Sequence, residues 1–256
     1  MNGRTAVITG GGRGVGAAVA ARLARAGARV LVVARTAAQV DAVARNLRDQ
    51  GHDAHAEPCD VSDPRSVERL AAAAAERLGR VDVLVNSAGV ATAASIHKTS
   101  IEEWNRMFAV NATAAFLCVK ALLPGMLERR WGRIVNVASI AGLTAGRYMG
   151  AYAASKHAVV GLTRAAAAET AAHGVTVNAV CPGYLDTDMT RETIARIVQR
   201  TGRTDAEALA AILEATPQRR LIAADEVAEA IAYLCTDAAR GVNGEALVID
   251  GGELRR

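Results

Sequence analysis

The sequence predicts an α/β protein in which helices cover both faces of one doubly wound, parallel β-sheet, built as a single domain over residues 1–256. Three observations support this fold class. Short β-branched runs alternate with amphipathic helical patterns. The runs are apolar throughout, as in strands that are buried on both faces. No Pro- or Ser-rich linker divides the chain, whose length suits one open α/β unit.

The elements follow one another regularly along the chain. Strands are predicted for the runs at residues 5–9, 29–33, 81–85, 133–138, 175–180 and 245–249. Thr36 can cap a helix that ends at Gly51, and Asp63 begins another that ends at Gly79. A last helix is predicted from Asp225. Residues of these types suit helix ends, where backbone groups lack partners within the helix.

Residues 184–217 depart from this alternation. The segment is polar, has a helical pattern without a strand of its own, and follows Pro182 and Gly183. Excursions at the carboxyl end of a strand often carry ligand contacts in a doubly wound sheet. We therefore expect this segment to be a substrate lid within the single domain.

Composition excludes several classes of protein. Hydrophobic residues make up 51% of the chain and the net charge is +4, which excludes a disordered chain. Aromatic residues make up 3% and no dense Lys/Arg run occurs, which argues against a nucleic-acid partner. The four cysteines are widely spaced, so no metal is expected. Neither a signal peptide nor an uncharged apolar stretch of about 18 residues occurs, so we expect a cytoplasmic protein without a membrane span.

A glycine-rich turn follows the first predicted strand and leads into a helix. Its residues include Gly10, Arg13, Gly14, Val15 and Gly16. Glycines in such a turn let the backbone approach a pyrophosphate, whose charge is met by the free N–H groups of the helix. A plain glycine-rich turn is the alternative, but the strand before it and the helix after it favour dinucleotide binding.

The second strand ends at Ala34 and Arg35, where a cofactor without a 2′-phosphate would need an acidic residue for its ribose. With Arg13 in the glycine-rich turn, two guanidinium groups could converge on a 2′-phosphate, with no carboxylate nearby to compete. The alternative is two solvated surface arginines. We therefore expect NADP(H) as the preferred cofactor, with NAD(H) possible.

Tyr152 and Lys156 lie four residues apart in a helical pattern, so both lie on one face. An ammonium group beside a phenol favours the phenolate and would lower the pKa of Tyr152 towards neutrality. This pair would suit proton transfer to a developing alkoxide. The same spacing is also frequent by chance.

Further motifs follow in a fixed order: Asn86-Ser87-Ala88-Gly89, Asn111, Ser139 thirteen residues before Tyr152, and Pro182-Gly183 with Thr187. Together with TGGGRGVG and YAASK, they resemble the short-chain dehydrogenase/reductase family in its common subfamily of chains about this length. The resemblance covers residues 3–252. It implies a single-domain Rossmann fold with a seven-stranded parallel sheet, and an oxidoreductase acting on CH–OH or C=O groups.

The resemblance also implies roles for individual residues. Tyr152 would be the acid/base, and Ser139 would hydrogen-bond the substrate carbonyl. Lys156 would bind the nicotinamide ribose, and Asn111 would hold a water in the proton relay. The implied cofactor contacts are Gly10, Arg13, Gly14, Val15 and Gly16 at the pyrophosphate, Asp60 and Val61 at the adenine, Asn86, Ala88 and Gly89 after the fourth strand, and Pro182, Gly183 and Thr187 beside the nicotinamide.

The stretches NAVCPGYLDTDM and ERRWGR resemble bacterial β-ketoacyl and polyketide ketoreductases. This implies an NADPH-dependent ketoreductase for a 3-oxoacyl thioester or a polyketide-like ketone. Arg129 and Arg130 could face an acidic acyl carrier protein or coenzyme A, although a solvated helix end explains them equally well. Arg147 could bind a substrate carboxylate.

Two other functions stay open. One is an NAD-dependent secondary-alcohol or 3-hydroxyacyl dehydrogenase working oxidatively, because fold alone does not fix cofactor or direction. The other is an NADP(H)-binding sensor or scaffold without turnover. Family resemblance further implies a homotetramer, in which the helix carrying Tyr152 and the helical pattern of residues 101–128 pair across one two-fold axis and the last strands pair across another.

Overall fold

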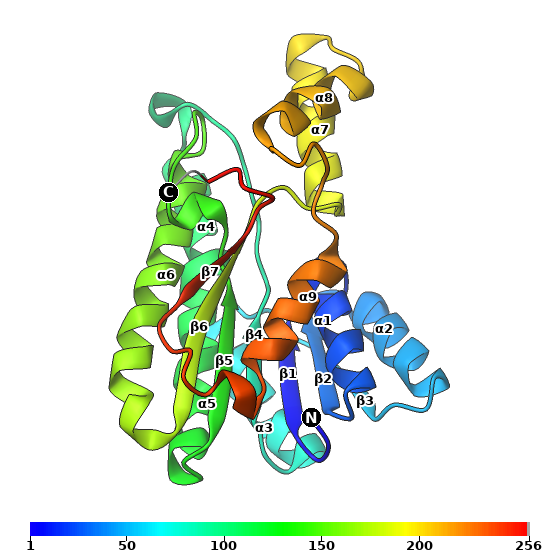
Figure 1. The fold of residues 1–256 in the computed structure, drawn as a ribbon, viewed down its shortest axis with the longest axis vertical. Coiled ribbons are helices and arrows are strands. Elements are labelled where there is room, and N and C mark those ends of the chain that lie inside the picture. Colours follow the sequence, from blue (N-terminus) through cyan, green and yellow to red (C-terminus); the bar gives the residue numbers. More distant parts are fainter. Residues whose placement is uncertain (255–256) are drawn as a thin grey trace.

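The strands lie parallel in one twisted sheet, which a computed structural model describes within residues 1–254 (Figure 1). Their order is β3-β2-β1-β4-β5-β6-β7. Their bounds are β1 (Thr5–Thr9), β2 (Arg29–Ala34), β3 (Ala54–Pro58), β4 (Val83–Asn86), β5 (Gly132–Val137), β6 (Val175–Pro182) and β7 (Ala246–Ile249). The predicted fold class is confirmed, including the seven parallel strands.

Helices cover both faces of this sheet. On one face lie α1 (Gly14–Arg25), α2 (Ala37–Asp49) and α9 (Ala224–Leu234), which share a buried core with the strands (Figure 1). On the other lie α3 (Pro64–Leu78), α5 (Ala114–Glu128) and α6 (Gly150–Thr170). Strands β1, β4 and β6 are buried along their whole length, as their mostly apolar runs predict.

The strand that the apolar pattern did not reveal is β3. Its sequence, AHAEP, contains no β-branched residue, and all but its first residue keep some exposure. It lies at the edge of the sheet and pairs only with β2 among the described strands. An edge strand needs little apolar surface, so its register is set by backbone pairing with its neighbour instead.

Two predicted helix starts illustrate how local sequence sets these elements. Asp63 caps α3 by accepting hydrogen bonds from the backbone N–H of Arg65 at 3.1 Å and of Ser66 at 3.2 Å. Gly79 follows α3 with a φ of +76°, as the predicted stop requires. The last helix begins one residue before the predicted Asp225, after the N-cap residue Ala223.

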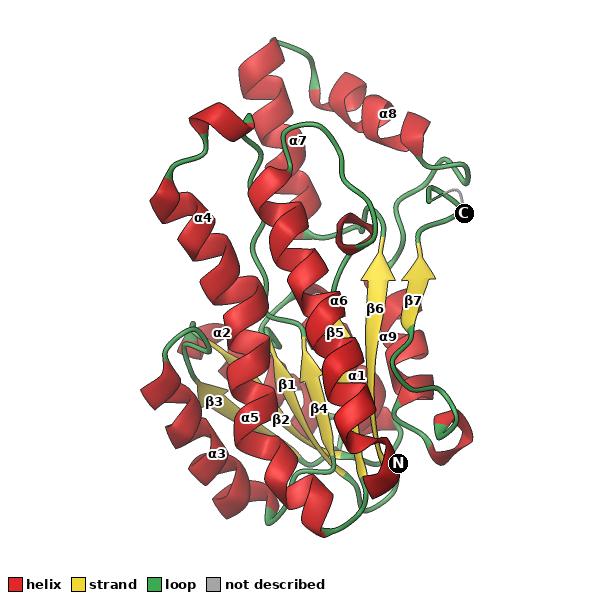
Figure 2. Cartoon of the chain, turned by 90° about the vertical axis from the view of Figure 1, so that its left-hand side faces the viewer, coloured by secondary structure: helices red, strands yellow, loops and turns green. Residues whose placement is uncertain are grey.

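Residues 184–217 form an arm of two helices, α7 (Asp188–Thr201) and α8 (Asp205–Ala215). Figure 2 shows both standing above the carboxyl ends of the strands. The segment has no strand of its own, as predicted, and one isolated bridge joins Leu185 to Ile222 after α8. Its position over the sheet suits a lid, and that role stays a prediction.

A continuous helical stretch, Ile101–Glu128, is long and apolar enough to cross a membrane by length and composition alone. It comprises α4 (Ile101–Phe108), a π-helical turn (Ala109–Thr113) and α5. One face of α5 packs on the sheet through Cys118, Leu122 and Met126. The apolar composition is therefore explained in part by the core of the protein.

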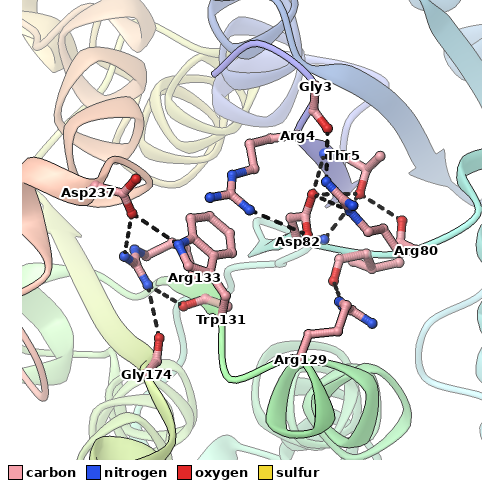
Figure 3. Close-up of polar contacts among 12 residues, drawn as sticks. Gly3, Arg4, Thr5, Arg80, Asp82, Arg129, Trp131, Arg133, Gly174 and Asp237 are labelled. Atoms are coloured by element: carbon pink, nitrogen blue, oxygen red, sulfur yellow. Dashed lines mark hydrogen bonds and ion pairs between the residues drawn. The ribbon is translucent and has the colours of Figure 1, made fainter.

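A polar cluster fastens the amino ends of the strands, opposite the arm (Figure 3). Asp82 is buried and accepts hydrogen bonds from the backbone N–H of Thr5 at 3.1 Å and from Arg80 Nε at 3.1 Å. Trp131 lies between two guanidinium groups, with Arg4 Cζ 3.5 Å and Arg133 Cζ 4.4 Å from its ring centroid. These contacts join the starts of β1, β4 and β5.

The two arginines considered for carrier docking lie at this same end. Arg129 Nη2 donates to the carbonyl oxygen of Val81 at 2.6 Å, and Arg130 Nη2 donates to that of Ala172 at 2.7 Å. Both side chains therefore bind backbone carbonyl groups near the amino ends of the strands, at the end of the sheet opposite the cavity. Their position gives the proposed carrier contact no further support.

Candidate active site

A large cavity opens at the carboxyl ends of the strands. Its volume is about 1570 Å³, and it spans the point where the strand order reverses between β1 and β4. Ligands of open parallel sheets bind at this point because the chain leaves the two strands in opposite directions. One face of α7 and the segments 87–95 and 137–149 form its other walls.

All but three of the predicted site residues line this cavity. The lining ones are Gly10, Arg13, Gly14, Val15, Arg35, Asp60, Val61, Ala88, Gly89, Ser139, Tyr152, Lys156, Pro182, Gly183 and Thr187. The exceptions are Gly16, Asn86 and Asn111. Each of the three shapes the cavity through a neighbour, as described below.

The glycine-rich turn after β1 leaves no room for a side chain at Gly10 or Gly16. Gly10 has a φ of +66°, and a Cβ there would lie 2.7 Å from the backbone nitrogen of Ala88. A Cβ on Gly16 would lie 2.2 Å from the carbonyl oxygen of Gly10. Gly16 therefore sets the path of the turn without lining the cavity. The first turn of α1 carries no acidic side chain, so its free N–H groups suit an anion.

Asn86 ends β4 inside a buried chain of hydrogen bonds. Its Nδ2 donates to Asn136 Oδ1 at 2.9 Å, and Asn136 Nδ2 donates to Thr163 Oγ1 at 2.9 Å. Thr9 Oγ1 accepts a further hydrogen bond from the backbone N–H of Ser87 at 3.2 Å. These bonds join β1, β4, β5 and α6 and fix the lining segment that follows β4. The cofactor contact predicted for Asn86 stays a prediction.

The adenosine end of the cavity lies beside the ends of β2 and β3. Arg35 is exposed there, and Asp60 accepts hydrogen bonds from the hydroxyl of Ser62 at 2.7 Å and from its backbone N–H at 3.0 Å. These hydrogen bonds, followed by the charge of Arg35, lower the pKa of Asp60. A carboxylate therefore does lie near Arg35, contrary to the expectation from the sequence, although the two form no ion pair.

Arg13 is paired, which the sequence did not reveal. Its Nη1 lies 3.4 Å from Asp188 Oδ2 and 3.6 Å from Glu192 Oε1, both on α7. The arm returns over the glycine-rich turn and brings these carboxylates to it from far along the chain. The expectation that no carboxylate competes for Arg13 is therefore wrong. These groups are half-exposed, so Arg13 can exchange them for another anion at low cost.

Ser139, Tyr152 and Lys156 meet on the wall between β5 and α6. Tyr152 is 9% exposed and Lys156 is 5% exposed. Ser139 Oγ accepts a hydrogen bond from the backbone N–H of Ala141 at 3.1 Å, which leaves its own O–H free to donate. Lys156 Nζ donates to the carbonyl oxygen of Val137 at 2.9 Å and lies 5.9 Å from the ring centroid of Tyr152.

Burial dominates the ionisation of this group. It raises the pKa of Tyr152, while the Ser139 hydroxyl opposes it, and it lowers the pKa of Lys156 to about 8. The lowered pKa predicted for Tyr152 is therefore wrong for this structure, because Lys156 Nζ is directed at Val137 and desolvation of the phenolate prevails. Tyr152 is a protonated phenol near neutral pH, which is the form that carbonyl reduction requires.

Asn111 lies in the π-helical turn between α4 and α5. Its Oδ1 accepts from the backbone N–H of Val90 at 2.9 Å, and its Nδ2 donates to the carbonyl oxygen of Val90 at 3.0 Å and to Ser155 Oγ at 2.9 Å. The side chain thus holds the lining segment after β4 against α6. A π-turn of this kind often occurs at a functional site. The predicted water-holding role stays a prediction.

The last predicted group lies where β6 ends. The backbone N–H of Gly183 donates to the carbonyl oxygen of Ile249 at 3.0 Å, and a Cβ on Gly183 would lie 3.0 Å from Asp250 Cβ. Thr187 precedes α7, and its side chain makes no capping hydrogen bond. Its Cγ2 lies 3.6 Å from the place of a Cβ on Gly14, so the two ends of the predicted cofactor site face each other.

The sequence predicted a lid over residues 184–217 but did not identify which side chains of α7 line the cavity. Thr193, Arg196, Ile197 and Arg200 line the cavity from this helix. Their spacing of three and four places them on one helical face, and that spacing is the signal that would have identified them. Glu253, near the end of the described chain, also lines the cavity and carried no comparable signal.

These features fit a nicotinamide dinucleotide. The glycine-rich turn and the free N–H groups of α1 would hold its pyrophosphate, and the end of β2 its adenosine ribose. Lys156 and the Pro182–Thr187 segment would lie beside the nicotinamide half. Within residues 1–254, no three His, Cys, Asp or Glu side chains are grouped so that they could hold a metal ion.

A glycine cradle at the switch point of a parallel sheet, with a Ser-Tyr-Lys group in the same cavity, defines an oxidoreductase that uses a nicotinamide cofactor. The chain belongs to the short chain dehydrogenase family, whose model matches residues 4–197.

Individual relatives span almost the whole chain. It is 42% identical over 250 residues to the cis-4-hydroxycyclohexanecarboxylate dehydrogenase of Sinomonas cyclohexanicum, covering 97% of this chain and 96% of that protein. It is 39% identical over 252 residues to the granaticin polyketide synthase putative ketoacyl reductase 1 of Streptomyces violaceoruber, covering 96% and 92%. A crystal structure of a variant of actinorhodin polyketide ketoreductase with NADPH matches with a TM-score of 0.95 at 38% identity, covering 98% and 97%.

Proposed function

We propose that this enzyme is an NADPH-dependent ketoreductase that reduces a ketone to a secondary alcohol, with a 3-oxoacyl thioester or polyketide-like ketone as its substrate. The observation that carries this proposal is the buried Ser139–Tyr152–Lys156 group on the wall of a cavity whose other half fits a dinucleotide. The ketoacyl and polyketide reductases among its relatives support the substrate class.

The side chains divide the chemistry between them. When bound, NADPH would supply the hydride that the carbonyl carbon of the substrate accepts. Tyr152 gives its phenolic proton to the carbonyl oxygen, so that hydride and proton together convert C=O to CH–OH. Ser139 donates its free O–H to the same oxygen as negative charge develops, and such a donor contributes about 3–4 kcal/mol in comparable sites. Lys156 would hold the nicotinamide ribose, and its ammonium charge would offset the negative charge of the phenolate that Tyr152 becomes after it gives up its proton.

A second candidate is an alcohol dehydrogenase that works oxidatively with NAD. The specific observation in its favour is the 42% identity to a hydroxycyclohexanecarboxylate dehydrogenase. Oxidation uses the same residues in reverse, with Tyr152 as the base. A cofactor-binding sensor without turnover is the non-enzyme alternative, and the buried Ser139–Tyr152–Lys156 group argues against it.

A substrate panel tests these alternatives. NADPH and NADH oxidation would be followed at 340 nm with acetoacetyl thioesters, cyclic ketones and aryl ketones, and NAD reduction with the corresponding alcohols. The proposal expects the largest kcat/KM for a β-ketothioester or cyclic ketone with NADPH. Faster oxidation of an alcohol with NAD would favour the dehydrogenase, and binding without turnover of any substrate would favour the sensor.

The depressed pKa of Lys156 predicts how reduction depends on pH. Because burial lowers that pKa to about 8, the ammonium form is lost as pH rises through this value, while the raised pKa of Tyr152 keeps the phenol protonated. We expect kcat/KM for NADPH to fall above pH about 8. Lys156→Arg should move this fall to higher pH, because a guanidinium keeps its proton. If kcat/KM for NADPH falls at the same pH in Lys156→Arg as in wild type, a group other than Lys156 causes the fall.

Assembly as a homotetramer is also part of the proposal. Phe116 on α5 is 47% exposed and borders a shallow hollow with Ala112 and Thr113 of the π-helical turn and Ala158 and Leu162 of α6. A second copy can cover this apolar face around a two-fold axis. Light scattering should give a tetramer, and Phe116→Asp should dissociate it to dimers. Ala38→Asp, which adds the same charge on the exposed side of α2, is the control. A stable wild-type monomer at micromolar concentration contradicts the assembly.

We place the enzyme in the cytoplasm. All four cysteines are buried free thiols. Burial raises the pKa of Cys118 and Cys235 to about 12, which keeps both in the unreactive thiol form. A chain of this size without disulfides suits a reducing compartment.

A further inference from the structure

The outer half of the cavity carries an excess of positive charge. Lys98 lines it from the end of a short 3₁₀ helix (Ile96–Lys98), Arg147 from a loop, and Arg196 and Arg200 from α7. Among residues 1–254, three acidic residues line the cavity: Asp60 and Asp188 lie near Arg35 and Arg13 on the cofactor side, and Glu253 lies on the substrate side. The predicted catalytic group does not require these four cations, and a neutral ketone would gain nothing from them.

The arginines of the arm differ in how they are neutralised. Arg191 is paired with Asp186 at 2.9 Å and with Asp188 at 2.9 Å, and it is not among the residues that line the cavity. In contrast, neither Arg196 nor Arg200 has a carboxylate oxygen within 4.0 Å in the described part of the chain. The charge of Arg196 contributes to the lowered pKa of Glu103, but Glu103 is itself bonded to Arg106 at 3.0 Å.

Arg196 is held in place by neutral groups. Its Nε donates to the carbonyl oxygen of Glu192 at 3.1 Å, its Nη1 to that of Ala91 at 3.1 Å, and its Nη2 to Thr193 Oγ1 at 3.4 Å. A guanidinium has five N–H groups, so two stay available after these three bonds. The side chain is thus oriented in advance while its full charge is kept, which favours binding of an anion.

Arg200 repeats this arrangement one turn further along α7. Its Nη1 donates to the carbonyl oxygen of Ala93 at 3.1 Å, on the same loop that Arg196 contacts. Since α7 rises about 1.5 Å per residue from Asp188, Arg196 lies roughly 12 Å and Arg200 roughly 18 Å along its axis. The start of α7 faces the cofactor turn through Thr187, so both arginines lie towards the outer end of the cavity.

We propose that Arg196, assisted by Arg200, binds an anionic group at the end of the substrate remote from its reacting carbonyl. A carboxylate and a phosphate share the chemistry that the guanidinium recognises, and both are therefore included. Arg196 is a specificity-determining residue in this proposal, which rests on the proposed ketone reduction at Tyr152. It restricts the substrate class to ketones that carry a negative charge.

Matched pairs of substrates test this assignment. The first pair is 4-oxocyclohexanecarboxylate and its methyl ester, which differ in a carboxylate. The second is acetoacetyl-4′-phosphopantetheine and acetoacetyl-pantetheine, which differ in one phosphate. For each pair the readout is the ratio of kcat/KM for the charged to the neutral compound, so that a general loss of activity cancels.

The wild-type ratio is expected to be roughly tenfold to a hundredfold for at least one pair, the usual effect of a charge-assisted hydrogen bond. Arg196→Gln should bring this ratio close to one, and Arg196→Lys should retain part of the preference. The control Arg191→Gln, which changes an arginine already neutralised by Asp186 and Asp188, should leave the ratio unchanged. A preference in the first pair identifies a carboxylate and in the second a phosphate.

Two results would overturn the inference. One is a wild-type ratio near one in both pairs. The other is an Arg196→Gln variant that keeps the wild-type ratio although its thermal unfolding shows an intact fold. The absence of turnover for all four compounds with either cofactor would contradict the proposed reduction itself, and titration of the protein with 4-oxocyclohexanecarboxylate would then still decide the anion site. Binding that Arg196→Gln abolishes supports the site, and equal binding by both proteins rejects it.

Discussion

Tyr152→Phe is expected to lower kcat for ketone reduction by at least about a hundredfold, because it removes the proton donor and leaves the ring in place. The ring packs among Met107, Ala141 and Ala153, contacts that phenylalanine can keep, so the variant should fold normally. The raised pKa of Tyr152 makes the phenol the species that donates its proton near neutral pH. Stopped-flow or steady-state absorbance at 340 nm measures the loss.

Controls separate this effect from damage to cofactor binding. NADPH affinity, measured by fluorescence titration, should barely change in Tyr152→Phe, because the proposed cofactor contacts lie on other residues. Lys156→Ala should weaken both binding and turnover, since Lys156 is assigned to the ribose as well. Tyr233→Phe, which removes a phenol that is 50% exposed on α9, should behave like wild type. Near-normal turnover by Tyr152→Phe would refute the mechanism.

Much of the fold could be predicted because the sequence signals are local. Central strands that are buried on both faces are mostly apolar, and the β-branched run from Val175 onward predicted such a strand although it also carries the buried Thr176 and Asn178. Asp63 and Gly79 marked the ends of α3, because a capping carboxylate and a left-handed glycine each satisfy a specific backbone need. The apolar pattern did not predict the edge strand β3, because β3 is held by backbone pairing with β2 and not by its own side chains.

The cavity shows the same division between local and distant information. The order of the motifs was enough to predict that Ser139, Tyr152 and Lys156 share one site. Ser139 follows a strand, and Tyr152 and Lys156 lie on one helix face. Contacts between residues far apart in the chain could not be predicted from the sequence. The pairing of Arg13 with Asp188 joins residues 175 positions apart, and no periodic pattern reports such a contact.

Electrostatics was the least predictable property of the site. The spacing of Tyr152 and Lys156 suggested an ammonium that lowers the pKa of the phenol. In the folded chain both groups are almost fully buried, and the amine is bonded to a carbonyl oxygen. Desolvation depends on everything packed around a group, so it follows from the complete fold and not from the distance between two residues in the sequence.

Cofactor preference gives the second large expected effect. We expect NADPH to bind tenfold to roughly a thousandfold more tightly than NADH, because a 2′-phosphate gains about 1.5–3 kcal/mol from each charge-assisted hydrogen bond at the end of β2. Arg35 is exposed there without an ion-pair partner among residues 1–254, whereas Arg13 must first exchange Asp188 and Glu192. Arg35→Gln should therefore reduce the preference more than Arg13→Gln does.

Combining Ala34→Asp with Arg35→Gln should reverse the preference. The new carboxylate would accept hydrogen bonds from the ribose hydroxyls of NADH and repel the 2′-phosphate of NADPH. Ala34 lines the cavity at the end of β2 and is half-buried, so an aspartate there would face the proposed ribose site. Turnover with saturating cofactor should stay close to that of wild type, because neither residue lies on the wall that carries Tyr152. Fluorescence titration with both cofactors measures the change. Wild-type protein that binds NADH as tightly as NADPH would show that Arg35 is a surface charge with no part in cofactor choice.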